Sequence, residues 1–162
     1  MAYRLDLSSF ANVVGQLPPK IEKAVIRGLV SAAMRGVSVC VENIGTRNPA
    51  TGTPPAVDEG DLQRSVSFHR IPFGAMIVVD APHASMVEYG TRPHTPPLQP
   101  LIDWAMRKFQ VDEVEAKKIA WGVRGKIKKV GTKPRRYMHR TVIQLRLKIV
   151  PEEIERELKA MP

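Results

Sequence analysis

The segment from Lys20 to Gly45 most strongly constrains the fold, because its apolar residues recur with the spacing of one helix face. Pro18 and Pro19 precede it, and a proline at the first helical position removes no hydrogen bond that the helix needs. Small residues within the segment indicate that another element packs closely against it; they are Gly28, Ala32, Ala33 and Gly36. The sequence therefore predicts one long helix over residues 19–45 that ends at Gly45.

Two shorter runs after this helix have the composition and alternation of strands. The runs "SVSFHR" and "AMIVVD" flank the turn-like "IPFG", which predicts an antiparallel hairpin. The next segment, "SMVEYG", is compatible with a third strand or a turn. We interpret "VEY" as the end of a sheet strand, with Gly90 allowing the turn that follows. In the preceding loop, Asp61 is expected to cap a short helical turn.

The last third of the chain is predicted to be helical. "LQPLIDWAMRKFQ" has an apolar helix face, and "VDEVEAKKIAWGVRGKIKK" begins with acids and ends with bases, as a helix dipole favours. Residues 135–160 are ambiguous, because the alternation of Ile143, Leu145, Leu147 and Ile149 also fits a strand. Their length favours a helix with a break near Pro151.

A short motif occurs twice in the sequence with one residue changed. "GTRP" at Gly90–Pro93 recurs as "GTKP" at Gly131–Pro134. We interpret the second copy as another glycine-proline turn before a helix, and not as a sign of a duplicated domain.

Together these elements predict a single α+β domain, since 162 residues suffice for one domain with its own core. Its long N-terminal helix packs on a small antiparallel sheet, formed by the hairpin and an extra strand, with C-terminal helices and proline-rich extended loops. The expected parts are an N-terminal arm (1–18), the helix (19–45), a loop (46–61), the hairpin and sheet (62–92), a proline-rich connector (93–100) and a basic helical part (101–160).

The N-terminus and the single cysteine bear on the compartment. Cys40 lies in an apolar stretch, which predicts a buried residue in a reducing environment. The first residues lack the basic and then apolar pattern of a signal peptide. We find no run that approaches the roughly 18 apolar residues of a membrane span. These features predict a cytoplasmic site of synthesis and no membrane partner.

Residues that could carry catalysis show no supporting pattern. The four "GT" pairs lack the context of a phosphate-binding loop, and the four histidines lack metal-ligand spacing. The acids Asp58, Glu59 and Asp61 are explained by loop solvation and helix capping. The sequence therefore predicts no enzyme, no metal site and no cofactor.

Positive charge is concentrated in the C-terminal part. Between Lys117 and Lys148 there are 12 Lys and Arg residues and no acid, within a chain of formal net charge +9. Such a field attracts phosphate or an acidic protein surface. No zinc finger, RNA-binding motif or clear helix-turn-helix accompanies it, so any nucleic-acid contact is expected to be non-specific. The candidate residues are Lys126, Lys128, Lys129, Lys133, Arg135 and Arg136.

Two motifs in order resemble a known family. "PPAVDEGDLQRSVSF", followed by "APHASMVEYGTRPHTPPLQPLIDWA", is similar to the tail-component (neck or tail-completion) family of long-tailed bacteriophages, whose members join the DNA-filled head to the tail. Glu59 stands where the family usually has threonine, and His83 where it has tyrosine. The later "GTKPRRYM" resembles the family's glycine-proline-aromatic segment before the last helix. The resemblance covers roughly Lys20 to Leu158. The matching residues are Pro55, Val57, Asp58, Gly60, Leu62, Arg64, Ser65, Ala84, Val87, Glu88, Tyr89, Gly90, Thr91, Gly131, Pro134, Tyr137 and Met138.

The resemblance implies a structural virion protein that is made in the bacterial host cytoplasm. It implies self-assembly into a ring, expected to be a hexamer, between head connector or stopper proteins and tail-tube or tail-terminator proteins. Non-specific contact with packaged DNA is a further expectation. Two alternatives stay open: a basic non-specific nucleic-acid-binding module, and a tail-assembly factor absent from the mature virion. The expected subunit-interface residues are Glu88, Tyr89, Gly90, Thr91, Arg92, Pro93, Pro96 and Pro97.

Overall fold

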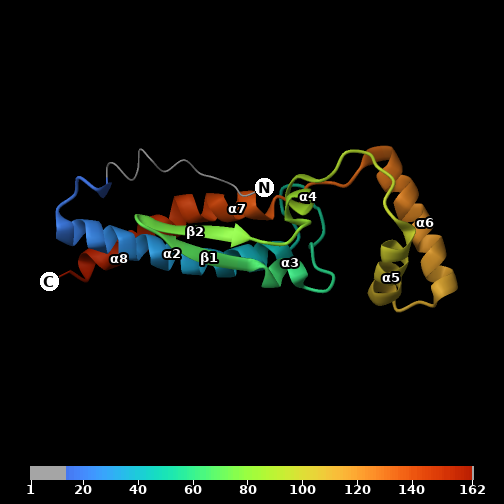
Figure 1. Ribbon diagram of the computed structural model, residues 1–162, viewed down its shortest axis with the longest axis horizontal. Helices are drawn as coiled ribbons and strands as arrows, with labels where there is room; N and C mark the ends of the chain where they lie inside the picture. The colour runs from blue at the N-terminus through green and yellow to red at the C-terminus, as the bar shows by residue number, and fades with distance from the viewer. Residues whose placement is uncertain (1–13, 162) are drawn as a thin grey trace.

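A computed structural model of the chain describes residues 14–161, and it shows an elongated molecule with a body at one end and a separate helical hairpin at the other (Figure 1). The predicted N-terminal arm lies mostly outside the described residues. The described elements are α2 (Pro19–Gly45), α3 (Asp61–Arg64), β1 (Val66–Ile71), β2 (Gly74–Val79), α4 (Ala84–Tyr89), α5 (Leu98–Phe109), α6 (Glu113–Val130), α7 (Tyr137–Gln144), the π-helical turn η1 (Leu145–Ile149) and α8 (Val150–Lys159).

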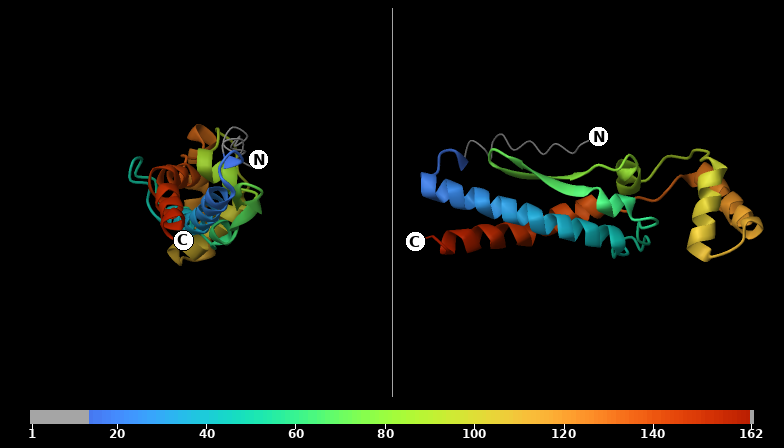
Figure 2. Two further views of the ribbon diagram at one scale, coloured as in Figure 1. Left: turned by 90° about the vertical axis from the view of Figure 1, so that its left-hand side faces the viewer. Right: turned by 60° about the horizontal axis from the view of Figure 1, so that its bottom comes forward.

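Helix α2 is the central element of the body and confirms the first prediction. It begins at Pro19, ends at Gly45, and contacts α7, α8 and both strands. Figure 2 shows α8 lying alongside it. A Cβ atom at Gly28 would lie 2.8 Å from Cα of Ile154, and one at Gly36 would lie 2.5 Å from Cδ1 of Ile77. The small residues of α2 therefore let α8 and the sheet approach its backbone closely, as predicted.

The composition of α2 corrects one sequence-based statement. It contains an 18-residue window with a mean hydropathy of 1.5, so by length and composition it could cross a membrane. The core helix of a globular body passes the same test. Here 44% of the window is buried inside the molecule, against α8, α7 and the sheet.

The sheet confirms the α+β class and the predicted hairpin. β1 and β2 pair in antiparallel register from Val66↔Val79 to Ile71↔Gly74, and α2 packs on them. Within residues 14–161 the sheet has these two strands. The predicted extra strand is wrong, because this segment is helix α4. A strand points successive side chains to opposite faces, whereas a helix places Ala84, Val87 and Glu88 on one face toward the body.

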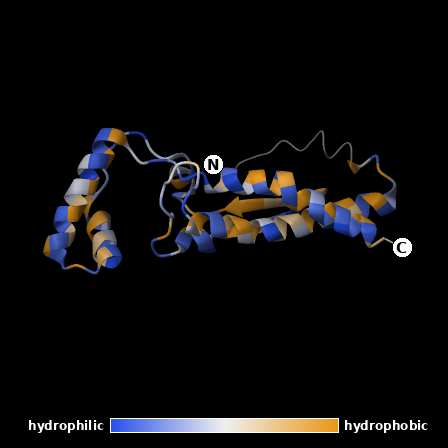
Figure 3. Cartoon of the chain, turned by 180° about the vertical axis from the view of Figure 1, so that it is seen from behind, coloured by the Kyte–Doolittle hydropathy of each residue, from blue (hydrophilic) through white to orange (hydrophobic). Residues whose placement is uncertain are grey.

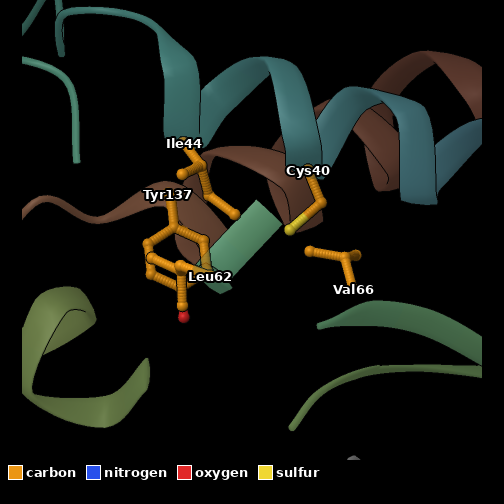
Figure 4. Close-up of a cluster of buried hydrophobic side chains, with 5 residues drawn as sticks. All are labelled: Cys40, Ile44, Leu62, Val66 and Tyr137. Carbon is orange, nitrogen blue, oxygen red and sulfur yellow. The ribbon is translucent and has the colours of Figure 1, made fainter. Parts of the chain in front are cut away.

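The body core lies between α2, α3, β1 and α7. Its buried members are Cys40, Ile44, Leu62, Val66 and Tyr137 (Figure 4). Burial raises the pKa of the Cys40 thiol to about 11, which fits the prediction of a buried residue. The Tyr137 hydroxyl donates a hydrogen bond of 3.2 Å to the carbonyl oxygen of Ala84, and this bond links α7 to α4.

The C-terminal segment is helical, as the sequence favoured, but it does not break at Pro151. Helical residues run from Tyr137 to Lys159, with the π-helical turn η1 in the middle. Pro151 has no N–H group and would clash within a regular α-helix. The wider turn directly before it places Pro151 in the first turn of α8, where no such donor is needed.

Two other boundaries differ from expectation. Asp61 does not cap α3; Gly60 holds the cap position, and Asp61 is the first helical residue, paired with Arg64. Helix α5 begins at Leu98, so the proline-rich connector is shorter than predicted. Pro100 falls in the first turn of α5, which tolerates proline for the same reason as α8.

Candidate interaction surface

The α5–α6 hairpin is a small unit with a core of its own. Its two helices pack on each other around Ile102, Ala105, Ala116 and Ala120, all buried. Asp112 caps α6, since its carboxylate accepts a hydrogen bond of 2.8 Å from the N–H of Glu115. Hydrophilic and hydrophobic residues are interspersed along both helices (Figure 3). The hairpin projects from the body (Figure 1), and most of the residues of its two helices are exposed.

The echoed motifs form the connection between hairpin and body. Gly90–Pro93 and Gly131–Pro134 run side by side, and we call these paired segments the stalk. The N–H of Thr91 donates to the carbonyl of Thr132 at 3.2 Å, and the N–H of Thr132 donates to that of Thr91 at 3.3 Å. Their hydroxyl oxygens lie 3.1 Å apart. The second motif is a turn before a helix, as predicted, but no local pattern indicated that the two copies pair.

Glycine is required at both entrances of the stalk. Gly90 has φ 73° and Gly131 has φ 71°, a left-handed conformation that other residues rarely adopt. A Cβ at Gly90 would overlap the carbonyl oxygen of Thr132, and a Cβ at Gly131 would overlap that of Thr91. Backbone strain and the close approach of the two strands therefore act together.

The buried side chain of Glu88 forms hydrogen bonds within the chain. It is 3% exposed, and its carboxylate accepts hydrogen bonds from the N–H groups of Met138 at 2.9 Å and His139 at 3.0 Å. These two groups lie in the first turn of α7, where a negative charge also interacts favourably with the helix dipole. Glu88 therefore joins α4 to α7.

The eight predicted interface residues divide into two groups. Glu88, Gly90 and Thr91 make contacts within the chain that explain their identity without a neighbour. The remaining five lie at the surface, with Pro96 half-buried and the others exposed; they are Tyr89, Arg92, Pro93, Pro96 and Pro97. A subunit contact through this second group stays a prediction.

The predicted basic residues gather at the end of α6 and along the stalk, with one exception. The exposed members are Lys126, Lys128, Lys129, Lys133 and Arg136. Arg135 differs, because its guanidinium donates to the carbonyl oxygen of Pro54 and is partly enclosed. Burial lowers the pKa of Arg135 from its ordinary value. This residue fastens the loop before α3 to the stalk and is a poor candidate for external contact.

One contact was missed from the sequence. Arg107 on α5 lies 2.7 Å from a carboxylate oxygen of Asp58 and 3.1 Å from one of Glu59. Hydrogen bonding with Asp58 is the main cause that raises the pKa of Arg107. The acid cluster therefore ties the body loop to the hairpin, in addition to the stalk. Nothing in the local sequence pointed to a partner 49 residues away.

Arg107→Gln is expected to free the hairpin without unfolding the protein. All three side chains are 39–54% exposed, so the free energy of unfolding should change little. Spin labels on α2 and α6 should report a broader distance distribution. The control is Lys108→Gln, which removes a neighbouring exposed charge that forms no ion pair within residues 14–161. An unchanged distribution in the Arg107 variant would mean that the stalk alone fixes the hairpin.

Gly122→Ala is expected to stabilise α6. A Cβ at Gly122 or Gly125 would meet no atom within 4 Å, so alanine adds helix propensity without a clash. The expected gain is up to about 1 kcal/mol at each position. Urea denaturation of Gly122→Ala and Gly125→Ala would measure it. A loss of stability in both variants would show that the outer face of α6 is already covered in the free protein.

Two further features of the described residues concern metal ligands and a groove. Across residues 14–161, no three His, Cys, Asp or Glu side chains lie together as metal ligands. A groove of about 340 Å³ beside β2 is bordered by Glu88 and Tyr137, whose contacts are described above. Comparisons with protein-family models, curated proteins and solved structures found no match. The resemblance to the phage family therefore rests on the quoted motifs and on the positions of their residues.

Proposed function

We propose that this chain is a structural subunit of a tailed bacteriophage particle, one that helps to join the DNA-filled head to the tail. The observation that carries the proposal is where the shared residues lie. Asp58 of "VDEGDLQRS" contacts the hairpin through Arg107, and Glu88, Gly90 and Thr91 of "VEYGTRP" build the base of the stalk. Residues of both motifs thus fix the position of the hairpin relative to the body.

An elongated subunit with a projecting hairpin suits a ring. Heterologous contacts between identical subunits close into a ring when the rotation between them closes. The hairpin exposes large apolar side chains for such contacts, among them Phe109 (51% exposed), Val114 (65%) and Val130 (66%). Prolines in the connector fix φ angles and reduce the entropy lost on docking. A hexameric ring is expected, in the neck or at the tail terminator.

A second exposed apolar surface lies on α7 and η1. Val142, Ile143 and Leu147 are 43%, 44% and 75% exposed. Neighbouring exposed apolar residues often mark contact sites. If the hairpin contacts one neighbouring subunit or partner ring, this surface on α7 and η1 is available for a second contact.

The test is assembly with partners. The purified protein, mixed with its head connector and tail-tube proteins, should enter ring-shaped complexes visible by electron microscopy, and loss of its gene should leave heads and tails separate. A Phe109→Glu/Val114→Glu variant should fail to restore joining, while Met34→Glu, which alters an exposed apolar residue of α2, serves as the matched control. Normal joining in the absence of the gene would refute the proposal.

A tail-assembly factor predicts a different particle composition. Mass spectrometry of purified virions should detect the chain if it is a joining subunit. Its absence from infectious particles would favour the assembly factor instead.

A further inference from the structure

The outward side of α6 carries a row of lysines. Helical spacing places Lys118 and Lys129 opposite the buried residues Ala116 and Ala120, with Lys128 at the edge of that side, and all three lysines are exposed. Trp121 lies on the same side and is 57% exposed. Lys118 was not among the candidates taken from the sequence, because only the packing of α6 shows which side faces outward.

These lysines form no ion pair within residues 14–161, although the exposed Glu115 lies one turn before Lys118. Lys117 forms an ion pair with Glu113 at 2.7 Å, but Lys118, Lys128 and Lys129 form no ion pair with any residue that the structure describes. Arg124 adds to the same field, since its guanidinium lies 5.0 Å from the centre of the Trp121 ring and donates to the carbonyl of Pro96 at 3.1 Å.

The spacing of this row fits a nucleic-acid duplex. From Lys118 to Lys129 the helix advances about 16 Å at about 1.5 Å per residue. Duplex DNA carries a phosphate charge about every 1.7 Å of its axis, so about ten phosphates lie along that length. Several lysines on flexible stems can each reach a phosphate oxygen within it.

We propose that this face of α6 binds the phosphate backbone of a nucleic-acid duplex without reading its sequence. Lysine is depleted at protein–protein interfaces, which disfavours an acidic protein as the partner. Lysine contacts phosphate as a point charge, and phosphate contacts carry no sequence information. The inference goes beyond the joining role, because it depends on the surface of α6 and not on ring formation.

The experiment measures binding of the purified full chain to labelled duplexes. Two unrelated DNA sequences and one RNA duplex, each of about 20 base pairs, are titrated between about 50 and 200 mM salt. The wild type should bind all three, with affinity falling linearly on a log–log plot against salt. The Lys118→Gln/Lys128→Gln/Lys129→Gln variant should lose at least about tenfold in affinity at the lowest salt, and its slope should fall by about 3, or about 0.9 per lost contact.

The matched control removes the same charge from the body. Lys20→Gln/Lys23→Gln/Arg70→Gln changes three exposed basic residues of α2 and β1 and should leave the slope unchanged. Circular dichroism should show the same helix content in both variants.

Four outcomes would overturn the inference. The first is an equal loss of affinity in both variants, which would mean a net-charge effect, and the second is an unchanged salt slope in the α6 variant. The third is binding to only one kind of duplex. The fourth is no duplex binding together with tight binding of polyglutamate. The last would identify an acidic protein surface as the partner. None of these results depends on the joining role, because the assay uses neither a ring nor the phage partners.

Discussion

Gly131→Ala is expected to open the stalk and to lower the free energy of unfolding by about 3 kcal/mol. The new Cβ would overlap the carbonyl oxygen of Thr91, and the residue would also have to hold φ 71°. The cheapest relief is separation of the two stalk segments, which breaks the Thr91–Thr132 backbone pair. The hairpin should keep its own fold, since its core around Ile102 and Ala120 lies apart from the stalk. Denaturation together with amide hydrogen exchange at Thr91 and Thr132 would measure both effects.

Gly52→Ala tests the cost of a positive φ angle at a position where the new Cβ meets no other atom. Gly52 has φ 66°, but a Cβ there would meet nothing within 4 Å. Its substitution should therefore cost only the conformational part, about 1 kcal/mol. If the two variants lose the same stability, the close approach at the stalk is not what requires glycine at Gly131.

Glu88→Ala should be the second most damaging change, with a loss of about 3 kcal/mol, because two N–H groups would lose a charged acceptor that is itself buried. These groups belong to Met138 and His139 in the first turn of α7. The variant should show faster amide exchange at both residues, and thermal or urea denaturation would give the change in stability.

Glu88→Gln provides the graded comparison. The amide keeps one acceptor oxygen but loses the charge and turns an NH₂ group toward a backbone donor, so the expected loss is smaller, about 1–2 kcal/mol. Glu42→Gln, at an exposed position of α2, is the control and should change little. A loss as small in Glu88→Gln as in Glu42→Gln would mean that the charge of Glu88 does not stabilise α7.

Long periodic elements could be predicted from the sequence. The apolar face of α2 repeats over 27 residues, and its small residues indicated the close packing that Gly28 and Gly36 show. The acid-to-base gradient of α6 also predicted a helix there. In such elements the local pattern and the tertiary packing favour the same structure.

Contacts between distant segments could not be predicted. "SMVEYG" has strand-like composition, yet it forms helix α4, and its Glu88 accepts hydrogen bonds from the first turn of a helix 50 residues further along the chain. The pairing of "GTRP" with "GTKP" likewise joins Thr91 and Thr132, which are 41 residues apart. Local propensity carries no information about such partners, and at these places the tertiary contact decided the structure.

The candidate surface was predicted in part. Charge counting located the basic region, but it could not distinguish Arg135, which is held by Pro54, from the exposed Lys128 and Lys129. That distinction needs the direction of each side chain, which for Arg135 depends on the loop before α3 and for the two lysines on which face of α6 is buried against α5. Tyr89 and the connector prolines were placed at the surface, and their role in assembly stays a prediction.

The paired stalk means that the chain leaves the body and returns to it at neighbouring points. Residues 94–130 therefore form an insertion between two neighbouring points of the chain, and we expect that they can be shortened, lengthened or replaced. A short turn would suffice to join Pro93 to Gly131. The elements that build the body core, α2, α3, β1 and α7, all lie outside this insertion. A chain built in this way can change what its tip touches while it keeps the same base.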